Sequence, residues 1–138
     1  MMKYFMTDNQ VIHEEEKLQD GVWVRMISPT QEECEEIADV LNVDIDDIKA
    51  ALDEEESSRI ELQDGYTLIL VDVPTTEIRH DKQSYTTIPL GIILTQDVIV
   101  TVCTEDTPRR STRPICASLI SAVRRLRSGS DNTPRTWI

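Results

Sequence analysis

The stretch VWVRMISPTQEE, residues 22–33, decides the fold because it joins a strand directly to the start of a helix. Its first half places apolar side chains on both alternating faces, which is typical of a strand covered at least partly on each side. One face holds Val22, Val24 and Met26, and the other holds Trp23 and Ile27, with Arg25 between them.

A helix is expected immediately after this strand. The Thr30 side chain can cap its first turn, and Glu33, three residues later, completes a capping box. The apolar stripe of the helix follows the i, i+3, i+4, i+7 spacing and comprises Cys34, Ile37, Ala38 and Leu41. Asn42 ends this helix, and Asp44 is the expected cap of a second helix whose stripe comprises Ile45, Ile48, Ala51 and Leu52.

Short strands are expected on either side of the two helices. They cover residues 2–7 and 10–13 before residue 22, and residues 60–62, 66–73, 85–94 and 98–102 after the helices. Asp64-Gly65 is a strong hairpin signal, residues 75–84 are expected to form a polar loop after Pro74, and Pro89 suggests a bulge or an edge position. The predicted order, β-β-β-α-α-β-β-β-β, indicates an α/β (α+β) fold with short helices on at least one face of a mixed β-sheet.

The charge of the chain divides it into two parts. The 138 residues favour one domain, and their net charge is −12. Residues 107–138 nevertheless hold half of the 14 basic residues, all of them Arg, and a single acid, Asp131. We therefore expect an acidic α/β domain over residues 1–106 and an Arg-rich tail over residues 107–138, with helical periodicity around residues 115–127.

Several classes of protein are not favoured by the sequence. No apolar run reaches the roughly 18 residues of a membrane span, so this chain is not expected to conduct ions by itself. No nucleophile motif, phosphate-binding loop or histidine pair at metal-ligand spacing is present, so an enzyme and an organic cofactor are not expected. The acidic part should repel nucleic acid and attract cations. The cysteines, Cys34, Cys103 and Cys116, are widely spaced and favour reduced thiols, the first two in the core.

A series of motifs resembles the CorA family of divalent-metal transporters over roughly residues 1–106. Each motif is weak alone, but their order and spacing are fairly specific. They are Trp23-x-x-Met26-x-Ser28-Pro29-Thr30-x-Glu32-Glu33, Leu41-Asn42-Val43 followed by Leu52, Ser58-Arg59-Ile60-Glu61, Asp64-x-Tyr66, and the closing strands Ile88–Leu94 and Asp97–Val102.

This resemblance implies the α/β/α-sandwich part of a cytoplasmic funnel, which forms a homopentamer in full-length members at the cytoplasmic face of the inner membrane. Without the stalk helix, the 138-residue chain itself is expected to be a monomer or a small oligomer. Members of the family transport Mg²⁺ and in some cases Co²⁺, and acidic residues at the subunit contacts of the funnel bind Mg²⁺ and help to keep the pore closed. The family continues with long helices, a Gly-Met-Asn loop and two membrane helices, and none of these patterns occurs in the 138 residues.

The sequence departs from the family pattern at one regulatory position and in the tail. The Glu-Asp pair of the family falls on Lys49-Ala50, and an alanine cannot bind metal. The neighbouring Asp46, Asp47 and Asp53 are the candidate ligands of a weak Mg²⁺ site at a subunit contact, since Mg²⁺ keeps several waters and needs only one or two carboxylates. The Arg-rich tail replaces an acid-rich helix and indicates a truncated, altered or divergent end.

Two functions therefore stay open. The first is a regulatory and assembly domain of a divalent-cation transporter, which acts through Mg²⁺ at subunit contacts. The second is a stand-alone acidic binding module that kept the fold without transport. A solvated charged surface is the plain alternative to a metal site for the acidic run Asp53–Glu56.

Overall fold

The strands and short helices follow the chain in the predicted order. The computed structural model describes residues 1–9 and 11–105. Its elements are β1 (Met2–Asp8), β2 (Val11–Glu15), β3 (Trp23–Ile27), α1 (Gln31–Leu41), α2 (Ile45–Lys49), the 3₁₀ helix η1 (Ala50–Leu52), β4 (Arg59–Gln63), β5 (Tyr66–Arg79), β6 (Lys82–Thr95) and β7 (Ile99–Cys103). The order predicted from the sequence is therefore confirmed.

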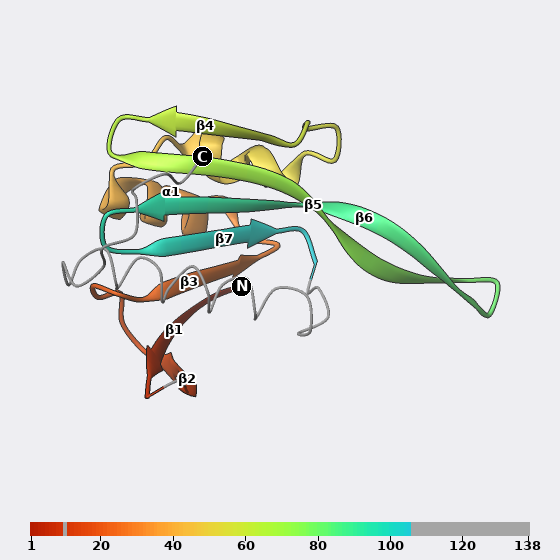
Figure 1. Cartoon of the computed structure of the whole chain (residues 1–138), viewed down its shortest axis with the longest axis horizontal. Helices are drawn as coiled ribbons and strands as arrows, with labels where there is room; N and C mark the ends of the chain where they lie inside the picture. The colour runs from red at the N-terminus through yellow and green to blue at the C-terminus, as the bar shows by residue number, and fades with distance from the viewer. Residues whose placement is uncertain (10, 106–138) are drawn as a thin grey trace, which may run out of the picture.

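One mixed sheet contains all seven strands, in the order β2-β1-β3-β7-β6-β5-β4 (Figure 1). Only β3 and β7 pair in parallel, and every other neighbouring pair is antiparallel. The helices lie on one face of the sheet (Figure 1). Within the described residues, helices therefore cover one face only, and the helix expected around residues 115–127 falls outside the part of the chain that the structure describes.

The predicted helix ends are confirmed. The Thr30 side chain accepts a hydrogen bond from the Glu33 backbone N–H at 3.2 Å, and the Glu33 carboxylate accepts from the Thr30 N–H at 3.0 Å. The hydrogen bond from the Thr30 backbone N–H is the largest cause of the lowered pKa of the Glu33 carboxyl. Asn42 closes α1 in the left-handed conformation, and Asp44 caps α2 by accepting from the Asp46 N–H at 2.9 Å.

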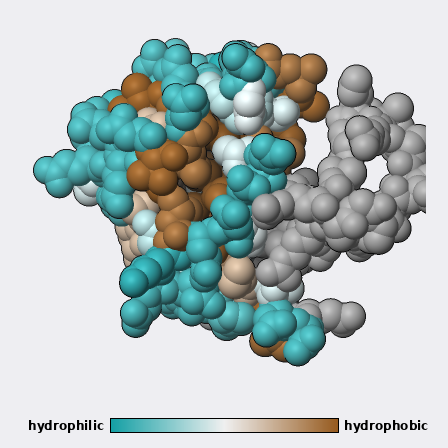
Figure 2. All heavy atoms as spheres, turned by 90° about the vertical axis from the view of Figure 1, so that its left-hand side faces the viewer, coloured by the Kyte–Doolittle hydropathy of each residue, from teal (hydrophilic) through white to brown (hydrophobic). Residues whose placement is uncertain are grey.

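β4 forms one edge of the sheet and carries exposed apolar side chains. Ile60 is 63% exposed and Leu62 is 76% exposed. Figure 2, which faces the end of the sheet where β4 finishes, shows hydrophobic surface at the upper side of the molecule, level with this strand. A tight turn at Asp64-Gly65 joins β4 to β5 as predicted, and Gly65 takes a φ of +86°, which favours glycine.

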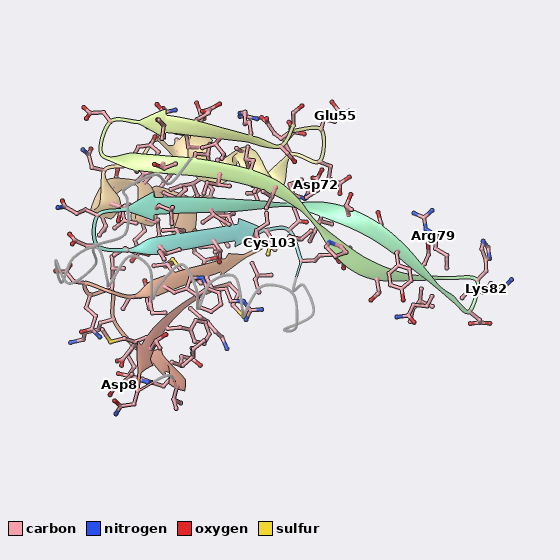
Figure 3. All side chains as sticks on the ribbon, viewed as in Figure 1. Asp8, Glu55, Asp72, Arg79, Lys82 and Cys103 are labelled. Carbon is pink, nitrogen blue, oxygen red and sulfur yellow. The ribbon has the colours of Figure 1, made fainter. Side chains whose placement is uncertain are left out.

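The expectation of a polar loop over residues 75–84 is wrong. β5 and β6 continue through this region as one long hairpin in unbroken register, from Tyr66↔Thr95 to Arg79↔Lys82 (Figures 1 and 3). Threonine, isoleucine and tyrosine in this stretch favour strands, and His80 and Asp81 both take positive φ, as a type I′ turn requires. We call its exposed end, residues 76–85, the arm.

The two prolines of this hairpin have different outcomes. Pro74 does not end β5. It lies opposite Thr87 of β6, at a position where β5 has no described strand on its other side, and a proline is tolerated at such an edge position. Pro89 causes no bulge, but the expected edge position is confirmed because β6 pairs with β7 only over Gly91–Leu94.

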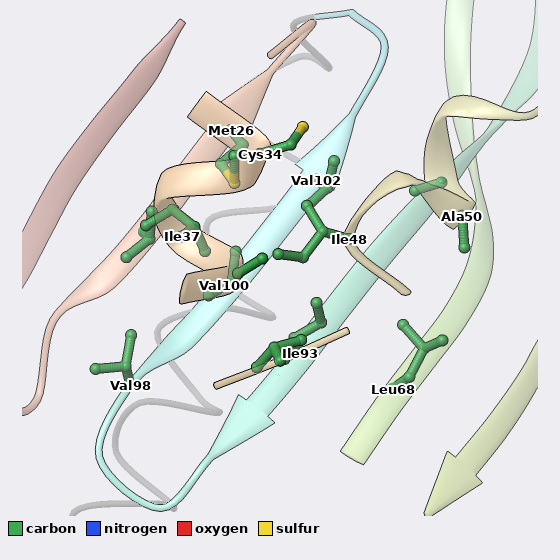
Figure 4. Close-up of a cluster of buried hydrophobic side chains, with 14 of the residues drawn as sticks. Met26, Cys34, Ile37, Ile48, Ala50, Leu68, Ile93, Val98, Val100 and Val102 are labelled. Carbon is green, nitrogen blue, oxygen red and sulfur yellow. The ribbon is translucent and has the colours of Figure 1, made fainter. Parts of the chain in front are cut away.

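Two hydrophobic clusters cover the two faces of the sheet. The helix-side cluster joins α1, α2 and η1 to the strands through side chains such as Met26, Cys34, Ile37, Ile48 and Val100 (Figure 4). The opposite cluster contains Trp23, Ile27, Val73, Ile88, Leu90, Ile92, Ile99 and Cys103. The predicted division of residues 22–27 between two covered faces is therefore confirmed, as are the buried positions of Cys34 and Cys103.

Close packing brings η1 down onto the sheet at Gly91. A Cβ atom placed on Gly91 would lie 2.9 Å from the Ala51 Cβ, which is closer than two carbon atoms can approach without movement. A glycine in β6 therefore lets the segment that carries the acidic residues approach the sheet.

None of the helices in the described part of the chain is long and apolar enough to cross a membrane.

Candidate functional site

The segment of residues 44–56, here called the acidic segment, concentrates negative charge on α2, η1 and the loop that follows. It contains seven acids and one base, Lys49. The Lys49 ammonium donates to the Gln31 side-chain oxygen at 2.5 Å, so its hydrogen bond goes to an amide of α1. Such a density of carboxylates attracts cations by ordinary electrostatics.

The three predicted metal ligands occupy different positions in this segment. Asp46 is exposed in the first turn of α2, and Asp53 is exposed just after η1, where it accepts from the Glu55 backbone N–H at 3.0 Å. Asp47 is half-buried, and its carboxylate accepts a hydrogen bond from the Tyr66 hydroxyl at 2.5 Å. Asp46 and Asp53 therefore present carboxylates to solvent, although one oxygen of Asp53 accepts from the Glu55 N–H, whereas Asp47 is half-buried and bound to Tyr66.

These three carboxylates do not converge on one point within a single chain. Asp53 follows Asp47 by six positions, which is roughly 10 Å along helical backbone, whereas Mg²⁺ binds oxygens at about 2.0–2.1 Å. Among the described residues, no three His, Cys, Asp or Glu side chains are grouped in a way that could hold a metal ion. A site built on this segment would need water or a second chain to complete it.

Tyr66 is the residue at this site that sequence reasoning missed. Its hydroxyl donates to Asp47 and accepts from the Asp44 backbone N–H at 3.3 Å, which ties the start of β5 to the start of α2. Burial and the hydrogen bond to Asp47 raise the pKa of Tyr66 to about 12. The motif Asp64-x-Tyr66 was visible in the sequence, but nothing in it indicated a partner 19 residues earlier.

We expect Tyr66→Phe to make the protein less stable below pH 10, by about 0.5–1.5 kcal/mol, because two hydrogen bonds are lost. The folded pKa of about 12 exceeds the ordinary tyrosine value of 10.0, so the hydroxyl contributes its full stability below pH 10 and loses it as the pH rises to 12. Denaturant midpoints of both proteins at pH 8 to 12 measure this difference. A gap between wild type and variant that stays constant up to pH 12 would contradict the assignment.

The family position at Lys49-Ala50 cannot supply a metal ligand. Ala50 is buried in the helix-side cluster, and it has no oxygen in its side chain. Close by, Arg59 donates to Glu56 and to Glu61, the latter at 2.6 Å, and these two bonds raise the pKa of its guanidinium. Arg59 is therefore engaged with Glu56 and Glu61, and Asp53, Glu54 and Glu55 are the exposed acids of the loop.

Comparison with known proteins gives the same family as the sequence motifs. The model of the CorA-like Mg2+ transporter protein family matches residues 19–133, which continues past the boundary expected at residue 106. The cobalt/magnesium transport protein CorA of Methanocaldococcus jannaschii is 26% identical over 81 residues. That match covers 59% of this chain and 24% of the relative.

Two solved structures share the fold. The soluble domain of CorA from Methanocaldococcus jannaschii superposes with a TM-score of 0.62 at 19% identity, over 98% of this chain and 48% of that one. The complete CorA magnesium transporter from the same organism gives a TM-score of 0.59 at 17% identity, over 88% of this chain and 37% of that one. The chain thus spans between a quarter and a half of the relatives it matches. Since the family model covers most of the chain and the fold agrees, the protein belongs to the CorA-like Mg2+ transporter family.

Proposed function

We propose that this domain is the cytoplasmic regulatory and assembly domain of a CorA-type divalent-cation transporter that carries Mg²⁺ or Co²⁺. Membership of the family and the shared fold support the transporter assignment. One observation carries the regulatory part: the acidic segment exposes the carboxylates of Asp46 and Asp53, yet its aspartates do not complete a metal site within one chain. Carboxylates of a neighbouring subunit can complete it.

The mechanism follows from linkage between ion binding and assembly. In the proposed homopentamer, Mg²⁺ bridges carboxylates of adjacent subunits and so binds the closed ring better than the open one. When internal Mg²⁺ falls, like charges face each other across the contact and loosen it. Because Mg²⁺ retains most of its waters, one or two carboxylates from each side are sufficient.

A melting experiment tests this proposal on the 138-residue chain. With Mg²⁺ at about ten times its dissociation constant, we expect about 1.4 kcal/mol of stabilisation and a melting temperature higher by on the order of 5 °C. NaCl of matched ionic strength should give a smaller rise, since it only screens a chain of net charge −12. Sedimentation in the same buffers should show larger species with Mg²⁺.

A pair of variants separates a specific site from general screening. Asp46→Asn together with Asp53→Asn should remove most of the response to Mg²⁺. Glu36→Gln together with Asp39→Asn, which removes two exposed acids of α1, changes the net charge equally and should preserve the response. Equal responses of the two variants, or equal effects of MgCl₂ and NaCl on wild type, would overturn the proposal in favour of a stand-alone module.

A further inference from the structure

The arm exposes two large apolar side chains on one face. Ile78 is 80% exposed and Tyr85 is 77% exposed, which makes them the two most exposed large hydrophobic side chains among the described residues. Gln83 lies opposite Ile78, and Thr76 lies opposite Tyr85, so Ile78 and Tyr85 are diagonal neighbours on the same face. Exposed apolar pairs on a two-stranded ribbon are costly in water and are typical of a binding surface.

A second exposed apolar pair lies elsewhere on the same chain. Ile60 and Leu62 alternate with polar residues of β4, so they share one face of an edge strand whose outer side has no partner among the described strands. The acidic loop of residues 53–58 leads directly into this strand, and Figure 3 shows Glu55 close to its beginning. This β4 surface is therefore apolar with acidic residues beside it.

The arm cannot cover the β4 surface of its own chain. β4 pairs with Tyr66–Leu70, the first part of β5, whereas the arm begins at residue 76 and projects away from the sheet (Figure 1). The two apolar pairs can therefore meet only between different copies of the chain.

Charge favours a second copy as the partner of the arm. Residues 76–85 contain two acids and two bases, whereas the other residues up to 105 contain 22 acids and 5 bases. The arm is thus a neutral projection on a strongly acidic body, and the side chains of Arg79 and Lys82 lie near its tip (Figure 3). Such an arm meets little repulsion at the acidic surface of another copy, whereas two acidic bodies repel each other.

We propose that the arm of one copy docks on the β4 surface of the next, with Ile78 and Tyr85 against Ile60 and Leu62. The tip residues Arg79 and Lys82 then lie near the acidic loop. The proposal rests on the proposed ring assembly, for which it names a contact. Because the two surfaces differ, the contact is heterologous, and repetition of a heterologous contact closes a ring when the rotation fits. A stable interface buries about 800 Å² on each side, so this small contact should give weak, concentration-dependent association.

Disulfide trapping tests the contact directly. All variants carry Cys116→Ser, and the buried Cys34 and Cys103 are kept. Chains with Ile78→Cys are mixed with chains with Leu62→Cys under mild oxidation, and mass spectrometry separates mixed dimers from dimers of one variant. We expect mixed dimers in at least fivefold excess over a control mixture of Ile78→Cys with Val40→Cys, an exposed position of α1.

Equal yields in the two mixtures, or a preference for Ile78→Cys dimers, would overturn the contact. As a second readout, Ile78→Ser with Tyr85→Ser should weaken self-association in sedimentation while the melting temperature stays within 2 °C, roughly the effect of 0.5 kcal/mol, because both side chains are exposed. If mixed disulfide dimers form but Mg²⁺ gives no specific stabilisation, only the proposed regulation by Mg²⁺ is contradicted. If Mg²⁺ stabilises the protein specifically but mixed dimers show no excess over the control mixture, only the contact of the arm is contradicted.

Discussion

Ile48→Ala is expected to lower the free energy of unfolding by about 2–5 kcal/mol, the range for large-to-small changes in a packed core. Ile48 is fully buried and is the one buried residue of α2, a helix of five residues. A helix this short has no stability of its own, so its attachment depends on the side chain that enters the core. Urea unfolding followed by circular dichroism measures the loss.

A matched substitution on α1 provides the control for this result. Val40 is 59% exposed, so Val40→Ala should change stability by no more than about 0.5 kcal/mol. Equal losses for the two variants would mean that α2 is not held through Ile48. Because the acidic segment is carried by this helix, we also expect Ile48→Ala to weaken the stabilisation by Mg²⁺.

Gly91→Ala is expected to destabilise the protein by about 1–3 kcal/mol, although alanine is the smallest possible addition. The new Cβ would lie 2.9 Å from the Ala51 Cβ, whereas the Leu70 side chain and the Val102 carbonyl oxygen, both at 3.7 Å, are at ordinary contact distance. Only the approach of η1 to the sheet is therefore obstructed.

A double-mutant cycle identifies this cause. Ala51→Gly removes the opposing Cβ, so Gly91→Ala should cost clearly less in that background than in wild type, with a coupling energy of at least 0.5 kcal/mol. Denaturant unfolding of the four proteins measures the coupling. Additive effects would show that the cost arises from some other property of the glycine.

The elements nearest to residues 22–33 were predictable because their signals are local. A capping box, a buried stripe and a two-faced strand each depend on residues a few positions apart, and the structure contains all three. The Asp64-Gly65 turn was predictable for the same reason, since two residues determine it. The family followed from such local motifs taken in order.

The arm was not predictable from the same kind of signal. Residues 75–84 are mostly polar and follow a proline, a pattern that resembles a loop, and the turn residues His80-Asp81 are not a common hairpin pair. Strand pairing from Thr76↔Tyr85 to Arg79↔Lys82, rather than burial, holds the arm in place. The β-branched threonines were the signal that favoured a strand.

The contacts of the candidate site also lay beyond sequence reasoning. Asp46, Asp47 and Asp53 share one short segment, but only the folded structure separates the exposed pair from the aspartate that binds Tyr66. Whether they bind Mg²⁺ at a subunit contact stays a prediction.

The parallel pairing of β3 with β7 has a consequence for how the chain folds. Trp23 lies opposite Ile99, so the two central strands come from opposite ends of the described sequence. Joining them closes a loop of more than 70 residues, and long loops of this kind slow folding. On the ribosome, the edge of β3 that pairs with β7 must stay unpaired until β7 has emerged, and in that interval it is open to chaperones and to aggregation.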